Sequence, residues 1–140
     1  MREINKTGKG NNIKIIPKRL QLKEVKHLIE LEENKHKLIT LKEKLNSIGD
    51  SLKITQLENE IKQLEKETNR PGFWENQQNS SNTLTKMKRM QNKVGNYRKL
   101  QNELENLESL NELLLEDEDI ELGKDVLKNT SILEEKLEKI

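Results

Sequence analysis

The chain has 140 residues, of which 36% are charged and 2% are aromatic. It contains no cysteine, which excludes disulfides and thiolate chemistry, and no apolar run of the roughly 18 residues that a membrane-spanning helix needs. The length leaves room for one domain. A composition this polar is typical either of a disordered chain or of long helices that meet along narrow apolar seams.

Charge is distributed unevenly along the chain. Residues 1–100 carry 22 Lys and Arg against 12 Asp and Glu, a net of +10, whereas residues 101–140 carry 4 against 13, a net of −9. Such a separation creates fields that can orient a molecule on a charged partner. The basic start lacks the apolar core of a secretory signal, so we expect a cytoplasmic location.

The apolar pattern divides the chain into an arm and a helical domain. Residues 1–19 combine glycines, asparagines and a proline without any helical repeat, so we expect a flexible basic arm there. From residue 20 onward, apolar residues recur at helical spacing, which predicts one helical domain over residues 20–140. The regular seams argue against disorder.

The first predicted helix ends near residue 50. Its apolar face carries Leu31, Leu38, Leu41, Leu45 and Ile48. We expect Gly49 and Asp50 to stop this helix, because a glycine commonly takes the left-handed position that closes a helix.

A second predicted helix follows, with an apolar seam of Ile54, Leu57, Ile61 and Leu64. Thr55 and Glu58 have the spacing of a capping box at its start, and Ser51 is an alternative cap. We expect the helix to end near Thr68.

The stretch RPGFW breaks the helical pattern and holds the only Phe and the only Trp of the chain. Pro71 disfavours helix at the residue before it, and Gly72 tolerates backbone angles that other residues do not. Large rings each bury roughly 150–250 Å². We therefore expect a structural corner at Pro71, Gly72, Phe73 and Trp74, with both rings closing the end of a helical hairpin; a binding role for the rings is the alternative.

The third predicted helix is the longest, from somewhere in 74–83 to about 115. Its seam is Met87, Met90, Val94, Tyr97, Leu100, Leu104, Leu107, Leu110 and Leu114. The acidic run at 116–119 predicts a turn or a new helix start. The tail again has apolar residues at helical spacing. Whether it is one helix or has a separate short helix starting at Ser131 is not decided by the spacing. The fold predicted is all-α: a three- to four-helix bundle, dominated by a long antiparallel helical hairpin with coiled-coil-like seams.

Side chains that could support catalysis or metal binding do not form a recognisable site. His27 and His36 are nine residues apart and have no convincing third ligand, so we interpret both as solvated. The carboxylates of residues 101–140 are interpreted as a solvated face. We expect no metal and no cofactor.

The segment RPGFWENQ and its flanks resemble the N-terminal helical domain of bacterial peptide chain release factor 2. That family has a Pro-x-Phe-Trp corner followed by polar residues, matched here by Pro71, Phe73, Trp74, Asn76 and Gln78. Arg70 replaces the acidic residue usual before the proline. Further matches are Gly49, Ser51 and Leu52 before the corner, and Lys93, Val94 and Tyr97 after it. The resemblance covers about residues 28–140, and the corner is more specific than leucine spacing, which any coiled coil supplies.

The resemblance implies a role in translation termination, with the domain placed toward the GTPase-associated region of the ribosome. In the family, a Ser-Pro-Phe motif in a later domain reads UGA and UAA, and a Gly-Gly-Gln loop serves peptidyl-tRNA hydrolysis. Neither string occurs in this sequence. We therefore expect a monomeric ribosome-docking module that is not an enzyme, with no membrane and no small-molecule substrate. The alternative is a structural or adaptor coiled coil, including a homodimer.

One basic stripe is the candidate contact with ribosomal RNA. Residues 76–102 contain no acidic residue but six basic ones, and Lys86, Arg89 and Lys93 share a helical stripe beside the apolar seam. Contact with RNA phosphates predicts steep salt dependence. The other interpretation is a hydrated face that pairs with the acidic tail.

Overall fold

The computed structural model describes residues 22–140, which form helices joined by short turns. The elements are α1 (Leu22–Leu52), α2 (Ile54–Thr68), the short 3-10 helix η1 (Phe73–Glu75), α3 (Gln77–Glu116) and α4 (Ile120–Glu138). No strand occurs within the described residues, and the all-α prediction is confirmed. The flexible basic N-terminal segment expected at residues 1–19 lies outside the described residues.

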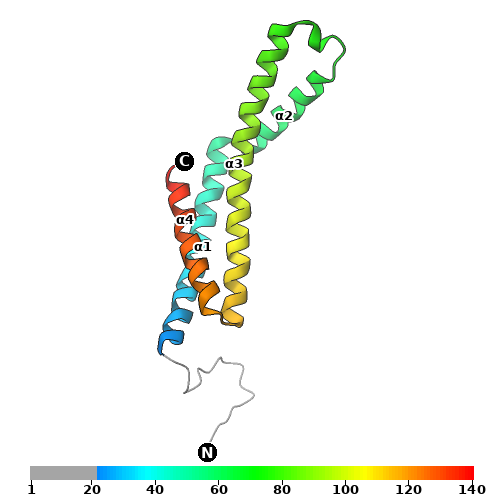
Figure 1. Cartoon of the computed structure of the whole chain (residues 1–140). Coiled ribbons are helices and arrows are strands. Elements are labelled where there is room, and N and C mark those ends of the chain that lie inside the picture. The colour runs from blue at the N-terminus through cyan, green and yellow to red at the C-terminus, as the bar shows by residue number, and fades with distance from the viewer. Residues whose placement is uncertain (1–21) are drawn as a thin grey trace, which may run out of the picture.

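The helices form two regions along one elongated molecule (Figure 1). Helix α3 runs through both regions, with α2 beside one half and α4 beside the other, where α4 also packs on α1. We call residues 22–52 and 97–140 the base, and residues 53–96 the arm. The sharp reversal between α2 and α3 lies at the free end of the arm, as the long-hairpin prediction requires.

Leucines from three helices form the core of the base. The buried apolar residues there are Leu31, Leu38, Leu41, Leu45, Tyr97, Leu104, Leu107, Leu114, Val126, Leu133 and Leu137. Most of them lie on the seams that the spacing predicted, because residues three, four or seven apart share one face of a helix. These residues belong to one cluster, which extends into the arm at Ile54.

A polar cluster that the sequence did not reveal crosses this core. Asn34 Nδ2 donates to Asn111 Oδ1 and to Thr130 Oγ1, each at 3.1 Å. Asn111 Nδ2 donates to the Leu31 carbonyl at 3.1 Å, and the Thr130 hydroxyl donates to the Val126 carbonyl at 2.8 Å. The cluster takes one side chain from each of α1, α3 and α4. Sliding any of these helices by one turn would leave buried polar groups without partners, so the cluster fixes their register.

The first helix does not end at Gly49, and that prediction was wrong. Helix α1 continues to Leu52, and the left-handed residue is Lys53, with φ 56°. A Cβ at Gly49 would collide with the Tyr97 ring. This glycine is therefore needed for the close approach of α3. Tyr97 completes the contact by donating its hydroxyl to the Leu45 carbonyl at 3.1 Å.

The predicted capping of the second helix was also wrong. Helix α2 begins at Ile54 directly after Lys53, and no side chain caps it. A capping residue usually has an extended backbone, but the residue before α2 is the left-handed Lys53. Neither Ser51 nor Thr55 therefore occupies the capping position. Glu58 instead receives two hydrogen bonds from Arg98 of α3.

The acidic run forms the turn between α3 and α4. Asp119 caps α4 by accepting a hydrogen bond from the Leu122 amide at 3.1 Å. The helix then runs without a break past Ser131, which resolves the question left open for the tail.

His27 was interpreted as solvated, and this was wrong: it is 4% exposed. Its imidazole lies against Gly123, where a Cβ would collide with the ring, and its Nε2 has no partner among the described residues. The ring fills the space that glycine leaves in α4. His36 is exposed, as expected.

Candidate functional site

The free end of the arm is a tightly bonded corner. Gly72 has φ 83°, a left-handed conformation that favours glycine. The Phe73 amide donates to the Arg70 carbonyl and the Glu75 amide to the Gly72 carbonyl, each at 3.1 Å. Pro71 and Gly72 thus reverse the chain directly into η1.

The start of α3 is anchored to the same corner. Asn76 caps the helix by accepting a hydrogen bond from the Asn79 amide at 3.1 Å. The buried Ser80 hydroxyl lies 2.8 Å from the carbonyl oxygens of both Phe73 and Asn76. These bonds hold the backbone of η1 against α3.

The two rings of the corner have different environments. Phe73 is buried, whereas Trp74 is 63% exposed, so the expectation that both rings would be buried was wrong for Trp74. Successive residues of a 3-10 helix point about 120° apart, and only one of two neighbours can face the helical hairpin. The rings still touch edge to face, with centroids 4.9 Å apart.

The basic stripe lies on the arm half of α3 and is free of intramolecular partners. Lys86, Arg89 and Lys93 are all exposed, and none forms an ion pair or side-chain hydrogen bond within residues 22–140. Beside them Met90 is buried and Val94 partly buried, which places the stripe next to the seam as predicted. The stripe is therefore three uncompensated cations on one exposed helix surface.

The acidic residues near the C-terminus find their partners elsewhere. The pairs are Lys35–Glu112 at 3.2 Å, Lys37–Glu134 at 3.0 Å, Lys42–Glu108 at 3.9 Å and Lys136–Glu103 at 3.1 Å. Three of these pairs join α1 to α3 or α4, and all lie in the base. In the described residues, the acidic tail thus neutralises lysines of α1, and the stripe of the arm is left to solvent.

One basic residue near the stripe is used inside the fold. Arg98 donates two hydrogen bonds to the Glu58 carboxylate, at 2.7 and 3.1 Å, and thereby ties α2 to α3. This bonding lowers the pKa of Glu58 below its ordinary value. Arg98 is therefore a structural link at the junction of arm and base.

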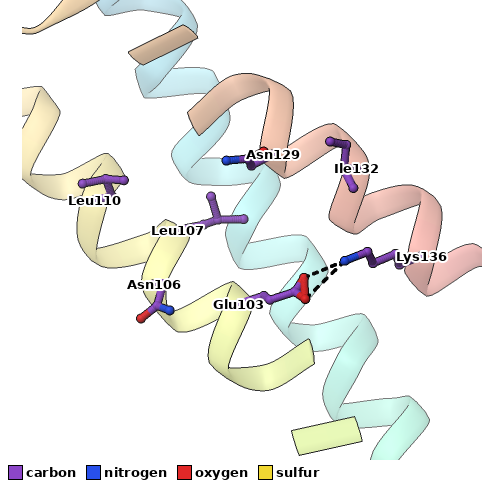
Figure 2. Close-up of a pocket in the computed structure, with 7 residues that line it drawn as sticks. All are labelled: Glu103, Asn106, Leu107, Leu110, Asn129, Ile132 and Lys136. Atoms are coloured by element: carbon purple, nitrogen blue, oxygen red, sulfur yellow. Dashed lines mark hydrogen bonds and ion pairs between the residues drawn. The ribbon is translucent and has the colours of Figure 1, made fainter. Parts of the chain in front are cut away.

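A pocket of about 350 Å³ lies between α3 and α4 in the base (Figure 2). Its charged lining residues, Glu103 and Lys136, bind each other across one end, and the rest of the lining is leucine, isoleucine and asparagine. The two charged groups of this pocket are thus bound to each other. Within residues 22–140, no cluster of His, Asp and Glu could hold a metal ion, and no helix is long and apolar enough to cross a membrane.

Comparison with known proteins finds one family whose matched segment includes both the corner and the stripe. The model of the PCRF domain matches residues 57–140, which is more than half of the chain. The chain belongs to the PCRF domain family. The match includes the α2–α3 corner, all of α3 and all of α4.

Named relatives agree with this family. Peptide chain release factor 2 of Clostridium perfringens strain SM101 is 28% identical over 111 residues, covering 79% of this chain and 30% of the relative. The proteins of the same name from Staphylococcus saprophyticus and Petrotoga mobilis are 32% and 34% identical, over 70% and 61% of this chain and 26% and 23% of their own lengths. The chain thus spans at most 30% of the length of these relatives. No solved structure matches it significantly.

The resemblance read from RPGFWENQ is confirmed by these comparisons. Sequence reasoning missed the exposure of Trp74 and the polar cluster in the base. For Trp74 a signal was present, because two adjacent rings in a short turn cannot both face one side.

Proposed function

We propose that residues 20–140 are the N-terminal domain of a class I bacterial release factor of the UGA/UAA type, acting in translation termination as a ribosome-docking module. The observation that carries this proposal is the basic stripe, exposed and unpaired on an arm that belongs to the PCRF domain family. The domain would work in the cytoplasm. It would contact ribosomal RNA and protein in the GTPase-associated region, and it would need no cofactor.

In this proposal the base and the arm have separate tasks. The base carries 12 Lys and Arg against 19 Asp and Glu, and four of its lysines are held in internal ion pairs, so it has little attraction for a polyanion. The arm carries Lys86, Arg89 and Lys93, which have no ion-pair or side-chain hydrogen-bond partner within residues 22–140. Each cation that neutralises an RNA phosphate releases counterions. Docking would therefore be strongest at low salt.

We further propose that the domain is monomeric and not itself catalytic. Asn34, Asn111 and Thr130 satisfy one another within a single chain, and the seams of α1, α3 and α4 are closed on each other. The base therefore has no free apolar seam on which a second copy of the chain could pack as a coiled coil. Stop-codon reading and ester hydrolysis are assigned to motifs that this sequence lacks.

Ribosome pelleting across a salt series tests the docking proposal. The triple variant Lys86→Glu, Arg89→Glu and Lys93→Glu should bind ribosomes more weakly than the parent chain, with the magnitude of the slope of log affinity against log salt reduced by up to about three. The matched control reverses three exposed basic residues in or directly after α4, Lys124, Lys128 and Lys139, and has the same net charge.

The control should retain the binding and the salt slope of the parent chain. Equal loss in both triple variants would mean that only total charge matters, and the proposed site would be wrong. Circular dichroism should show equal helicity in all three proteins, and sedimentation should show monomers.

A further inference from the structure

Trp74 is the most conspicuous apolar group on the surface of the arm. It is 63% exposed, although it is the largest side chain in the sequence. The ring touches Phe73, but the fold leaves most of its surface to solvent. Tryptophan is among the residue types enriched in binding hot spots.

The backbone presents this ring rigidly. The hydrogen bonds that close η1 fix the residues on both sides of Trp74, and Ser80 fastens the neighbouring Phe73 carbonyl to α3. The buried Phe73 ring meets the indole edge to face at an interplanar angle of 88°. A ligand that packs on the indole would thus meet a preorganised surface, at little cost in conformational entropy.

The charges along the arm half of α3 favour a polyanion as the ligand. Helix α3 carries no acidic residue from its start to residue 102, and the stripe begins nine residues after Gln77, about 14 Å along the helix axis. Lys93 lies about 24 Å from the same start. The nearby Glu75 has a carboxylate oxygen turned back toward Gly72. Proteins that bind unpaired nucleotides combine aromatic side chains, on which bases stack, with cations that contact the phosphates.

We propose that Trp74 stacks on an unpaired base of an RNA loop while Lys86, Arg89 and Lys93 contact the phosphates of the adjoining stem. This inference rests on the proposed RNA-docking function and adds to it a preference for looped over fully paired RNA. Stacking tolerates any base, because every base has a π face, so Trp74 selects an accessible base and not a sequence.

The chain contains a built-in reporter, because Trp74 is its only tryptophan. The first experiment titrates the 140-residue chain with two synthetic RNAs that have equal numbers of phosphates: a hairpin with a loop of unpaired adenosines, and a blunt, fully paired duplex. With excitation beyond the tyrosine band, the hairpin should quench the indole emission and the duplex should leave it almost unchanged. The hairpin should also bind at least fivefold more tightly.

Variants then separate the ring from the charges. Trp74→Ala should weaken hairpin binding by roughly 5- to 150-fold, the range for losing one stacked base, and leave duplex binding unchanged. Trp74→Phe should retain most of the hairpin affinity, measured with labelled RNA. The triple Glu variant of the stripe should bind both RNAs more weakly, since both carry phosphates.

Each alternative outcome overturns a defined part of this account. If Trp74→Ala leaves both affinities unchanged while the stripe variant lowers both, the stacking proposal is wrong and the docking function stands. If the stripe variant binds RNA and ribosomes like the parent, the docking function itself fails. If Trp74→Ala weakens ribosome pelleting but neither RNA quenches the indole, the ring contacts a protein surface, which also overturns the RNA proposal.

Discussion

The base and the arm use the same helix, α3, in opposite ways. In the base, α3 is enclosed by α1 and α4 and contributes four buried apolar residues, Tyr97, Leu104, Leu107 and Leu114. In the arm it packs on α2 and, at the tip, on the short η1, and only Ile54, Phe73, Ser80 and Met90 are buried across residues 53–96. A third helix makes a closed core, whereas two helices leave much of their surface to solvent. Stability should thus reside in the base, and the surface available for binding in the arm.

The largest expected effect tests where stability resides. Leu133→Ala removes a side chain that is 1% exposed in the base and should lower the free energy of unfolding by about 2–5 kcal/mol. The arm counterpart, Leu57→Ala, removes a partly buried side chain and should cost about 1 kcal/mol. Urea unfolding followed by circular dichroism measures both. Equal losses would show that the arm is packed as well as the base.

The polar cluster of the base should give the next largest effect. Asn34→Ala leaves the Asn111 amide oxygen without its donor, and burial of an unsatisfied polar group costs about 1–3 kcal/mol. An equally polar residue of α1 outside the cluster, the exposed Asn46, is the control and should tolerate alanine within about 0.5 kcal/mol. Asn34→Leu should in addition weaken the register, visible as self-association in sedimentation. A monomer of unchanged stability would show that the cluster is dispensable.

Two glycines sharpen the comparison further, because the same substitution to alanine should lower stability at one and raise it at the other. Gly49→Ala places a methyl group against the Tyr97 ring and should destabilise the chain by about 1–3 kcal/mol. Gly95→Ala meets no atom within 4 Å and should stabilise it by up to about 1 kcal/mol. Thermal unfolding of both variants tests this. A stabilised Gly49→Ala would mean that Tyr97 can move away freely.

These glycines also show what the sequence could and could not predict. Leucine spacing located the helices and most of the core, because helical periodicity is a local property. The reading of Gly49 failed because a glycine before a predicted break is equally consistent with a cap and with a close approach, and the choice depends on Tyr97, far along the chain. The RPGFW corner was correctly read as a break.

Long-range packing explains the other misses. Asn34 lies 77 residues from Asn111 and 96 from Thr130. Each of the three lies three or four residues from buried apolar residues of its own helix, so helical spacing does place it on a seam. What local spacing could not show is that these three polar side chains bond to one another across the core. His27 was placed in solvent because its partner is the space left by Gly123, a missing side chain that carries no signal in the sequence. Among the site residues, the exposure of Lys86, Arg89 and Lys93 followed from helical spacing, whereas their lack of partners needed the position of α4.

The smallest expected effect on stability concerns the residue with the largest side chain. Trp74→Ala should change the free energy of unfolding by no more than about 0.5 kcal/mol, because the ring is already 63% exposed and its loss opens no cavity. Phe73→Ala, one residue earlier, removes a buried ring and should loosen the whole tip, seen as faster hydrogen exchange at the start of α3. Exchange there should be unchanged in Trp74→Ala. If Trp74→Ala instead costs several kcal/mol, the indole is a packing element of the arm, and a loss of RNA binding in that variant would reflect a misformed tip and not a missing stacking surface.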